Sequence, residues 1–239
     1  MKNKLSSLSI FFPFLNDEGT VPQQIADAYY YGKKVTDNLE VIAINGGKSK
    51  DDTFEAIKKM KLKYPDLKII DRTENTEGYA VIKHGFWAAS KDWIFYTDGD
   101  RQYHLDELEK LVSTQMQSNA DIVNGYKTSR EDNVFRHFFG EIYRLLSKLL
   151  FQLPIRDTDC DFRLIRNSIM QQIDLTSTNA SILPEMIKKL ELKKAKFVEI
   201  PVQHYARTWS TSNYTTYNLL KEKLLGDLKL WRELRKFRG

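Results

Sequence analysis

Short apolar segments alternate with longer amphipathic segments through the first half of this 239-residue chain, and this alternation limits the fold more than any other feature. We expect strands at 7–14, 40–44, 67–71, 93–96 and 121–125, and helices at 21–33, 51–64 and 80–90. Strands that alternate with helices are typical of βαβ units, which build a parallel sheet covered by helices. The sequence therefore predicts an α/β fold with a mainly parallel central sheet.

Two acidic residues, Asp98 and Asp100, follow directly after the strand expected at 93–96. Side chains two positions apart in an extended chain point the same way, so both carboxylates can face one cation. Alone they would repel each other by roughly 4 kcal/mol at about 4 Å and an effective dielectric constant of about 20. A divalent ion removes that cost, and oxygen ligands favour Mg²⁺ or Mn²⁺. The tripeptide by itself is also consistent with a plain turn.

The position of this turn along the chain favours a binding site. Asn16, Asn45 and Asp98 each follow a predicted strand. In open parallel sheets, ligands bind beyond the carboxyl ends of the strands. We therefore expect three polar loops to meet at one rim, where a cation and a phosphate-bearing ligand bind.

The composition indicates a globular protein of the cytoplasm. Its 41% hydrophobic content is enough for a substantial core, and the single cysteine, Cys160, excludes an intrachain disulfide framework. The polar first residues do not resemble a cleaved signal, and no apolar run approaches the roughly 20 residues that cross a bilayer as a helix. The net charge of +5 is spread among 32 acidic residues, so we expect no nucleic-acid partner.

Two basic amphipathic helices are expected in the second half, at 135–153 and from Tyr217 onward. Each carries apolar residues at helical spacing, with Lys and Arg on its other faces. Either helix could pack on the core or rest on a membrane surface, where each cation near an anionic leaflet adds about 1 kcal/mol of attraction. Both alternatives stay open from the sequence.

Six motifs follow one another between Leu8 and Tyr214. They are Phe12-Pro13-Phe14-Leu15-Asn16-Asp17-Glu18, the segment Asn45 to Thr53, the segment Asn75 to Ala80 with Gly85-Phe86, Asp98-Gly99-Asp100-Arg101-Gln102, Pro154 to Arg163, and Pro201-Val202 with His204, Arg207, Ser210 and Ser212. Together they resemble the family 2 glycosyltransferases, and within them the dolichol-phosphate mannosyltransferase-like enzymes that load a sugar onto a polyprenyl phosphate. The most specific match is the fourth motif, which is similar to the family's Asp-x-Asp-x-Gln metal motif.

Some positions depart from the family pattern. Asn45 and Gly46 stand where the family usually has two acids, and Glu77 and Tyr79 replace small residues. Asp161 replaces a glycine. The departures at Asn45, Gly46, Glu77 and Tyr79 also allow a different interpretation, a catalytically weakened protein that binds nucleotide-sugars.

The resemblance implies a glycosyltransferase A-type, Rossmann-like fold, with a catalytic domain over 1–215 and a basic amphipathic helix over 216–239. It implies a metal, Mg²⁺ or Mn²⁺, held by Asp98, Asp100 and Gln102, and catalytic roles for Asp100, Asp157 and Arg163. Substrate-binding residues are expected at Pro13, Asn16, Glu18, Asn45, Asn75, Asp98, Arg130, Arg136, His204, Arg207 and Ser212.

The expected reaction moves a sugar from a GDP- or UDP-linked donor, with inversion, to a dolichyl or undecaprenyl phosphate at the cytoplasmic membrane face. Arg207 suits a bidentate contact with the donor's diphosphate. A lipid phosphate needs cationic hosts, for which Arg130, Arg136 and Arg163 are candidates. A sugar hydroxyl on a polysaccharide or glycolipid would instead need a general base, such as Asp157, Asp159 or Asp161. A separate membrane subunit is a further expected partner.

Overall fold

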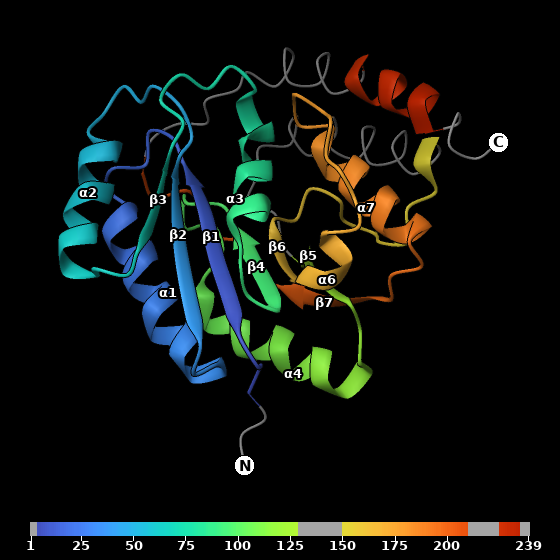
Figure 1. Ribbon diagram of the computed structural model, residues 1–239, viewed down its shortest axis with the longest axis horizontal. Helices are drawn as coiled ribbons and strands as arrows, with labels where there is room; N and C mark the ends of the chain where they lie inside the picture. Colours follow the sequence, from blue (N-terminus) through green and yellow to red (C-terminus); the bar gives the residue numbers. More distant parts are fainter. Residues whose placement is uncertain (1–3, 129–149, 210–224, 235–239) are drawn as a thin grey trace.

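The computed structural model describes residues 4–128, 150–209 and 225–234. Within these ranges the chain forms one sheet of seven strands in the order β3-β2-β1-β4-β6-β5-β7 (Figure 1). The strands are β1 (Leu8–Phe14), β2 (Leu39–Asn45), β3 (Lys68–Asp71), β4 (Trp93–Thr97), β5 (Ile122–Lys127), β6 (Phe162–Arg166) and β7 (Phe197–Val202). Strands β1 to β4 run parallel to one another, and β5 is parallel to β7. The predicted α/β fold with a mainly parallel sheet is confirmed.

Helices cover both faces of the sheet. They are α1 (Val21–Val35), α2 (Thr53–Lys63), α3 (Ile82–Ala88), α4 (Leu108–Ser118), the short α6 (Asn167–Met170) and α7 (Ile182–Leu192). A further helix occupies residues 225–234. The helix expected at 80–90 is divided into a 3-10 turn, Gly78–Val81, followed by α3. Most of the helix expected at 135–153 lies outside the described residues.

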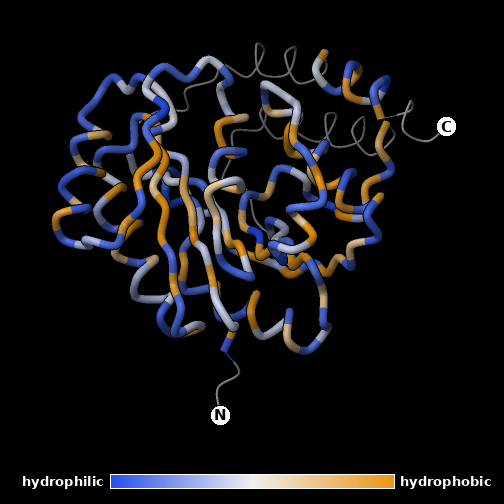
Figure 2. Tube along the Cα trace, viewed as in Figure 1, coloured by the Kyte–Doolittle hydropathy of each residue, from blue (hydrophilic) through white to orange (hydrophobic). Residues whose placement is uncertain are grey.

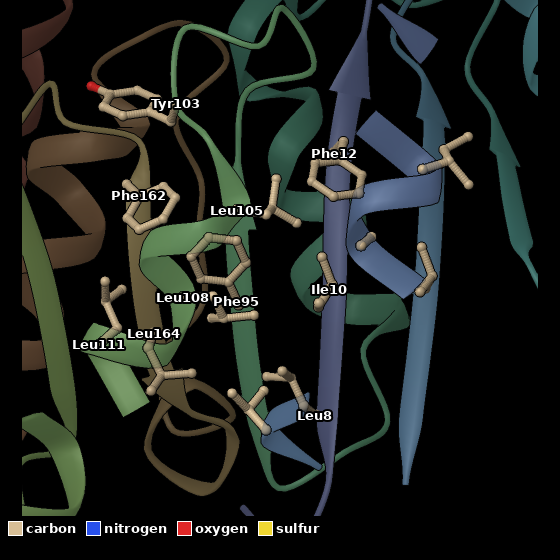
Figure 3. Packing of buried hydrophobic residues seen from close by; sticks show 14 of the residues in the cluster. Leu8, Ile10, Phe12, Phe95, Tyr103, Leu105, Leu108, Leu111, Phe162 and Leu164 are labelled. Atoms are coloured by element: carbon tan, nitrogen blue, oxygen red, sulfur yellow. The ribbon is translucent and has the colours of Figure 1, made fainter. Parts of the chain in front are cut away.

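The central strands are apolar on both faces because each face is covered (Figure 2). In β1, Leu8, Ile10 and Phe12 pack against α1, α2 and α4, whereas Phe11 points to the other face, toward α3. Figure 3 shows the first of these layers, where Phe95 of β4 and Phe162 of β6 meet edge to face at 4.8 Å. This double-sided core holds β1 and β4 rigidly side by side, so their C-terminal ends have fixed positions.

Strand β6 is antiparallel to both of its neighbours, β4 and β5. The sequence analysis did not predict this strand. Thr97, the last residue of β4, pairs with Phe162, the first residue of β6. The residue before β6 therefore reaches the same rim as the residues after β1, β2 and β4.

The edges of the sheet are β3 and β7. Strand β3 has only four residues, and β7 contains Pro201, which has no N–H to offer. The Pro201 carbonyl accepts a hydrogen bond from Lys110 Nζ at 2.5 Å, and the Gln203 N–H donates to Glu107 Oε1 at 2.8 Å. Side chains of the α4 region therefore occupy backbone groups at this edge.

Two basic amphipathic helices were expected, each either packed on the core or resting on a membrane surface, and part of the second is described. In the helix at 225–234, Leu230 and Leu234 pack on Phe151, whereas Leu225 and Leu228 are 60% and 43% exposed. Among the described residues, no helix is both long enough and apolar enough to span a membrane.

Candidate active site

A pocket opens at the rim where β1, β2 and β4 end. Its empty space is about 600 Å³, part of which is open solvent. The lining residues are Pro13, Phe14, Leu15, Asp17, Gly46, Gly78, Tyr79, Val81, Asp98, Gly99, Asp100 and Arg207. The three loops that were expected to meet at one rim thus do so, and both acids of the Asp98-Gly99-Asp100 turn face this pocket.

The turn that carries the two acids is fixed by β1 and by the start of α1. A Cβ atom at Gly99 would overlap the ring of Phe14 and lie 2.7 Å from the Pro13 carbonyl oxygen, so only glycine fits there. Thr20 Oγ1 donates to the Gly99 carbonyl at 2.8 Å, and Gln24 Nε2 donates to the Asp98 carbonyl at 3.1 Å. The two carboxylates therefore stand on a rigid support.

A strap after β7, residues 203–209, crosses the rim and brings Arg207 into the pocket. One nitrogen of its guanidinium lies 2.5 Å from Asp100 Oδ2, and the other lies 3.9 Å from Asp17 Oδ1. Two hydrogen bonds between Gln102 and Tyr205 hold the strap. Gln102 Nε2 donates to the Tyr205 carbonyl at 3.0 Å, and the Tyr205 N–H donates to the Gln102 carbonyl at 2.9 Å. The segment Asp98 to Gln102 and the strap are therefore joined by hydrogen bonds.

Asp17 is a site residue that the sequence analysis did not select. Burial, aided by the nearby charge of Asp100, raises its pKa to about 7, although the Leu15 N–H bonds to its carboxylate. Its Oδ1 atom is buried and has no hydrogen-bond partner among the described residues. No alternation marks it in the sequence, because Phe14 also lines the pocket and the left-handed φ of 59° at Asn16 interrupts the extended chain.

Asp98 and Asp161 are neighbours because of the strand register. They directly extend the Thr97 and Phe162 pair of β4 and β6. Burial raises the pKa of both carboxyl groups, and the charges of Asp161 and Asp100 raise the pKa of Asp98 further. Three acids, Asp17, Asp98 and Asp100, line a pocket with Arg207, and Asp161 lies beside Asp98; such crowding of acids favours the binding of a cation.

The expectation that Arg163 contacts a ligand is wrong. Its side chain is 0% exposed, and its guanidinium donates to Asn124 Oδ1, to the Tyr96 hydroxyl and to the Thr158 carbonyl. Tyr96 in turn donates to Asp161 Oδ1 at 3.0 Å. Arg163 therefore supports Asp161 from inside the sheet, because a buried cation must satisfy its donors with protein groups.

Four of the expected substrate-binding residues bond to neighbouring loops and lie outside the set that lines the pocket. Asn16 Oδ1 accepts from the Lys50 N–H at 2.6 Å, and Glu18 Oε2 accepts from the Asp52 N–H at 3.3 Å. Asn45 Nδ2 donates to Asp71 and Thr73, and Asn75 Nδ2 donates to the carbonyls of Gly46 and Gly78. These side chains shape the pocket through its loops.

The remaining expected residues are more distant or not described. Asp157 is buried, and its carboxylate accepts from the Lys127 N–H at 3.2 Å. The His204 ring packs edge to face on Tyr103 at 5.1 Å. Arg130, Arg136 and Ser212 lie outside the described residues.

The donor set at the rim suits a hard divalent ion. Asp98 and Asp100 offer carboxylate oxygens, which Mg²⁺ and Mn²⁺ prefer, and Asp17 Oδ1, which has no hydrogen-bond partner among the described residues, adds a further oxygen to the same pocket. In the described part of the chain, no three His, Cys, Asp or Glu side chains form a ready-made metal site. The residues therefore fit an ion that completes its coordination with water or ligand oxygens.

Comparison with known proteins points in the same direction. The sequence profile of "Glycosyl transferase family 2" matches residues 9–174. The chain is 23% identical over 216 residues to the undecaprenyl-phosphate 4-deoxy-4-formamido-L-arabinose transferase of Salmonella choleraesuis (strain SC-B67), which covers 90% of this chain and 65% of that protein. The protein of the same name from Photorhabdus laumondii is 23% identical over 217 residues, covering 91% and 66%. The chain thus spans just under two thirds of these relatives.

Solved structures share the fold. Glucosyl-3-phosphoglycerate synthase from Mycobacterium tuberculosis, in complex with Mn²⁺, UDP and phosphoglyceric acid, superposes with a TM-score of 0.68 at 13% identity, covering 95% of this chain and 78% of that one. The mannosyltransferase PcManGT from Pyrobaculum calidifontis, in complex with GDP-Man and Mn²⁺, gives 0.69 at 15% identity, covering 98% and 66%. The expected glycosyltransferase A-type fold is confirmed, and with well over half of its length matched by the family profile, the chain belongs to glycosyl transferase family 2.

Proposed function

We propose that this protein is a metal-dependent, inverting glycosyltransferase that moves a sugar from a UDP- or GDP-linked donor to a polyprenyl phosphate. The observation that carries the proposal is the convergence of Asp98, Asp100, Asp17 and Arg207 in one pocket at the carboxyl rim of the sheet. The curated relatives, named as undecaprenyl-phosphate transferases, support the acceptor class.

In this proposal the pocket holds the donor by its diphosphate. Arg207 leaves Asp100 and donates to the diphosphate oxygens, a charge-assisted contact that a planar guanidinium makes well. Asp98 and Asp100 would hold Mg²⁺ or Mn²⁺, with Gln102 positioning the turn, and the bound ion would supply Lewis-acid stabilisation of the leaving diphosphate. Pro13, Leu15 and Gly46 form the side of the pocket that faces the loops after β1 and β2, where we place the nucleoside.

The acceptor decides whether a base is needed. A phosphate is already anionic at neutral pH and attacks the anomeric carbon without losing a proton, which inverts the configuration in one displacement. A sugar hydroxyl needs a carboxylate within reach. Asp157 and Asp161 are both buried and already accept hydrogen bonds, from Lys127 and from Tyr96. This arrangement supports a phosphate acceptor over a hydroxyl acceptor.

We further propose peripheral attachment to the cytoplasmic face of a membrane. The exposed Leu225 and Leu228 share their helix with Lys229 and Arg232, and Leu230 and Leu234 bury the opposite side on Phe151. An amphipathic surface with apolar and cationic side chains suits an anionic leaflet. Arg130 and Arg136 are the candidate hosts of the lipid phosphate, and a membrane subunit would assist the anchoring.

Transfer of radiolabelled sugar tests this function. UDP- and GDP-linked sugars are incubated with Mn²⁺ and with undecaprenyl phosphate, dolichyl phosphate or free oligosaccharide, and product masses are recorded. We expect label in the lipid phosphate product alone, lost in Asp100→Ala and in Arg136→Ala. Label in the oligosaccharide would identify a hydroxyl-directed enzyme. Thermal stabilisation by a nucleotide-sugar without transfer to any acceptor would identify a binding protein instead.

A further inference from the structure

The hydroxyl of Tyr79 lies between two acids of the site, Asp98 and the buried Asp161. It donates to Asp98 Oδ1 at 3.0 Å and also interacts with the carboxylate of Asp161. Tyr79 and Asp161 are both positions where the family pattern has a small residue or a glycine. The two departures therefore meet, at the first acid of the metal motif.

The tyrosine is held firmly in this place. Gly78, directly before it, has φ 53°, a left-handed conformation that favours glycine, and its carbonyl accepts from Asn75 Nδ2 at 3.1 Å. The Tyr79 ring packs against the core between α3 and the sheet, and it also lines the pocket. The hydroxyl thus reaches Asp98 from a fixed base.

The contact geometry pairs that hydroxyl with Asp98, whose Oδ1 lies 3.0 Å away. A phenol has one hydrogen to donate. Asp161 already receives the hydroxyl hydrogen of Tyr96, and Tyr96 receives a hydrogen bond from Arg163. Asp161 thus has a donor besides Tyr79, and the Tyr79 hydrogen bond to Asp98 offsets part of the repulsion that Asp161 exerts on Asp98.

We propose that Tyr79 is a positioning residue for Asp98. Its hydroxyl fixes Oδ1 of Asp98 and leaves Oδ2 for a divalent cation. The inference rests on the metal dependence in the proposed function. Partners that orient a metal ligand are worth about 10- to 100-fold in metal affinity. Removing the hydroxyl while keeping the ring should therefore weaken the binding of the cation and leave the fold in place.

The test compares Tyr79→Phe with Tyr29→Phe, using Mn²⁺ alone as the probe. Tyr29, on helix α1, is a matched control, because its hydroxyl also donates a hydrogen bond to an aspartate, Asp66 Oδ1, at 2.9 Å. Mn²⁺ affinity is measured by electron paramagnetic resonance and by calorimetry, and folding by circular dichroism. We expect Tyr79→Phe to bind Mn²⁺ at least about tenfold more weakly than the wild type, and Tyr29→Phe to bind it normally.

Wild-type affinity in Tyr79→Phe would overturn the inference while leaving the metal in place. Equal weakening in both variants would show a general loss of stability and would also overturn it. If the wild-type protein itself fails to bind Mn²⁺, the metal dependence of the proposed function falls, and this role of Tyr79 falls with it.

Discussion

The guanidinium of Arg207 bonds to the carboxylate of Asp100 at 2.5 Å, although the two residues are 107 positions apart in the chain. The arginine side chain is therefore paired with Asp100, an acid that we expect to bind a metal ion. Arginine and metal compete for Asp100, and a diphosphate can relieve the competition by accepting the arginine.

Arg207→Ala should accordingly separate two affinities. Without the competing guanidinium, Mn²⁺ alone should bind about tenfold more tightly, since a hydrogen bond between charged groups is worth about 1.5–3 kcal/mol. UDP or GDP in the presence of Mn²⁺ should bind more weakly. Calorimetry measures both affinities. Arg207→Lys is the comparison variant, because it keeps the positive charge but loses the bidentate geometry of the guanidinium. Weaker binding of Mn²⁺ alone would contradict this competition.

Asn45→Asp should destabilise the protein. Asn45 Nδ2 donates to Asp71 Oδ1 at 2.9 Å, and the hydrogen bonds from Thr73, together with this one, lower the pKa of Asp71. An aspartate at 45 would set two carboxylates against each other, at a cost of about 1–3 kcal/mol in the free energy of unfolding. Urea denaturation at pH 7 measures the change. The double variant with Asp71→Asn restores a donor and should regain most of the loss, and no recovery would refute the pairing.

Glu40→Gln should reduce stability in a pH-dependent way. Burial alone would raise the pKa of Glu40, but hydrogen bonds from Lys68, Ser9 and Ser90 outweigh it and lower the pKa to about 2. A carboxyl group whose pKa is lower in the folded state stabilises the fold above its unfolded pKa, and this contribution disappears as the pH falls toward 2.

The expected loss in Glu40→Gln is roughly 3 kcal/mol at pH 7, shrinking steadily below about pH 4.5. Denaturation curves at several pH values measure it. Glu55→Gln serves as the matched control and should change little, because Glu55 is exposed and its ion pair among the described residues is with Lys58 on the same helix. A loss in Glu40→Gln that does not vary with pH would contradict the ionised state of Glu40.

Cys160 should be inert to thiol reagents in the folded protein. It is fully buried beside Asp161, and burial raises the pKa of its thiol to about 12. Only the thiolate reacts, so alkylation by iodoacetamide at pH 7.5 should be about 1,000-fold slower than in urea. Mass spectrometry follows the reaction, with Cys160→Ser as the blank. Rapid labelling of the folded protein would mean that the buried region around Cys160 and Asp161 opens to solvent.

The parts of the fold and site that the sequence predicted correctly have local signals. Strand β4 and its acids stand next to each other in the chain, so an apolar run followed by Asp98 and Asp100 was sufficient. Arg207 was found through its motif. The pairing of Arg207 with Asp100 depends on the path of the strap, and no short segment of sequence predicts this pairing.

The failures have non-local causes. Asp161 reaches Asp98 only because β6 runs antiparallel in one particular register, and a short apolar strand gives no indication of its direction. Arg163 stands in a motif rich in charges, but its burial results from Asn124 and Tyr96, which lie far away in sequence. Asn45 does lie at the end of a strand, as the sequence predicted. Its hydrogen bond to Asp71 could not be predicted from that position.

The protected edge at β7 bears on how this protein behaves in concentrated solution. An open strand acts as a template on which a second copy can add its own strand, and repeated addition leads to insoluble fibres. Proline at 201 and the lysine side chain at its carbonyl interrupt that template. Growth of the sheet from chain to chain is therefore disfavoured at this edge.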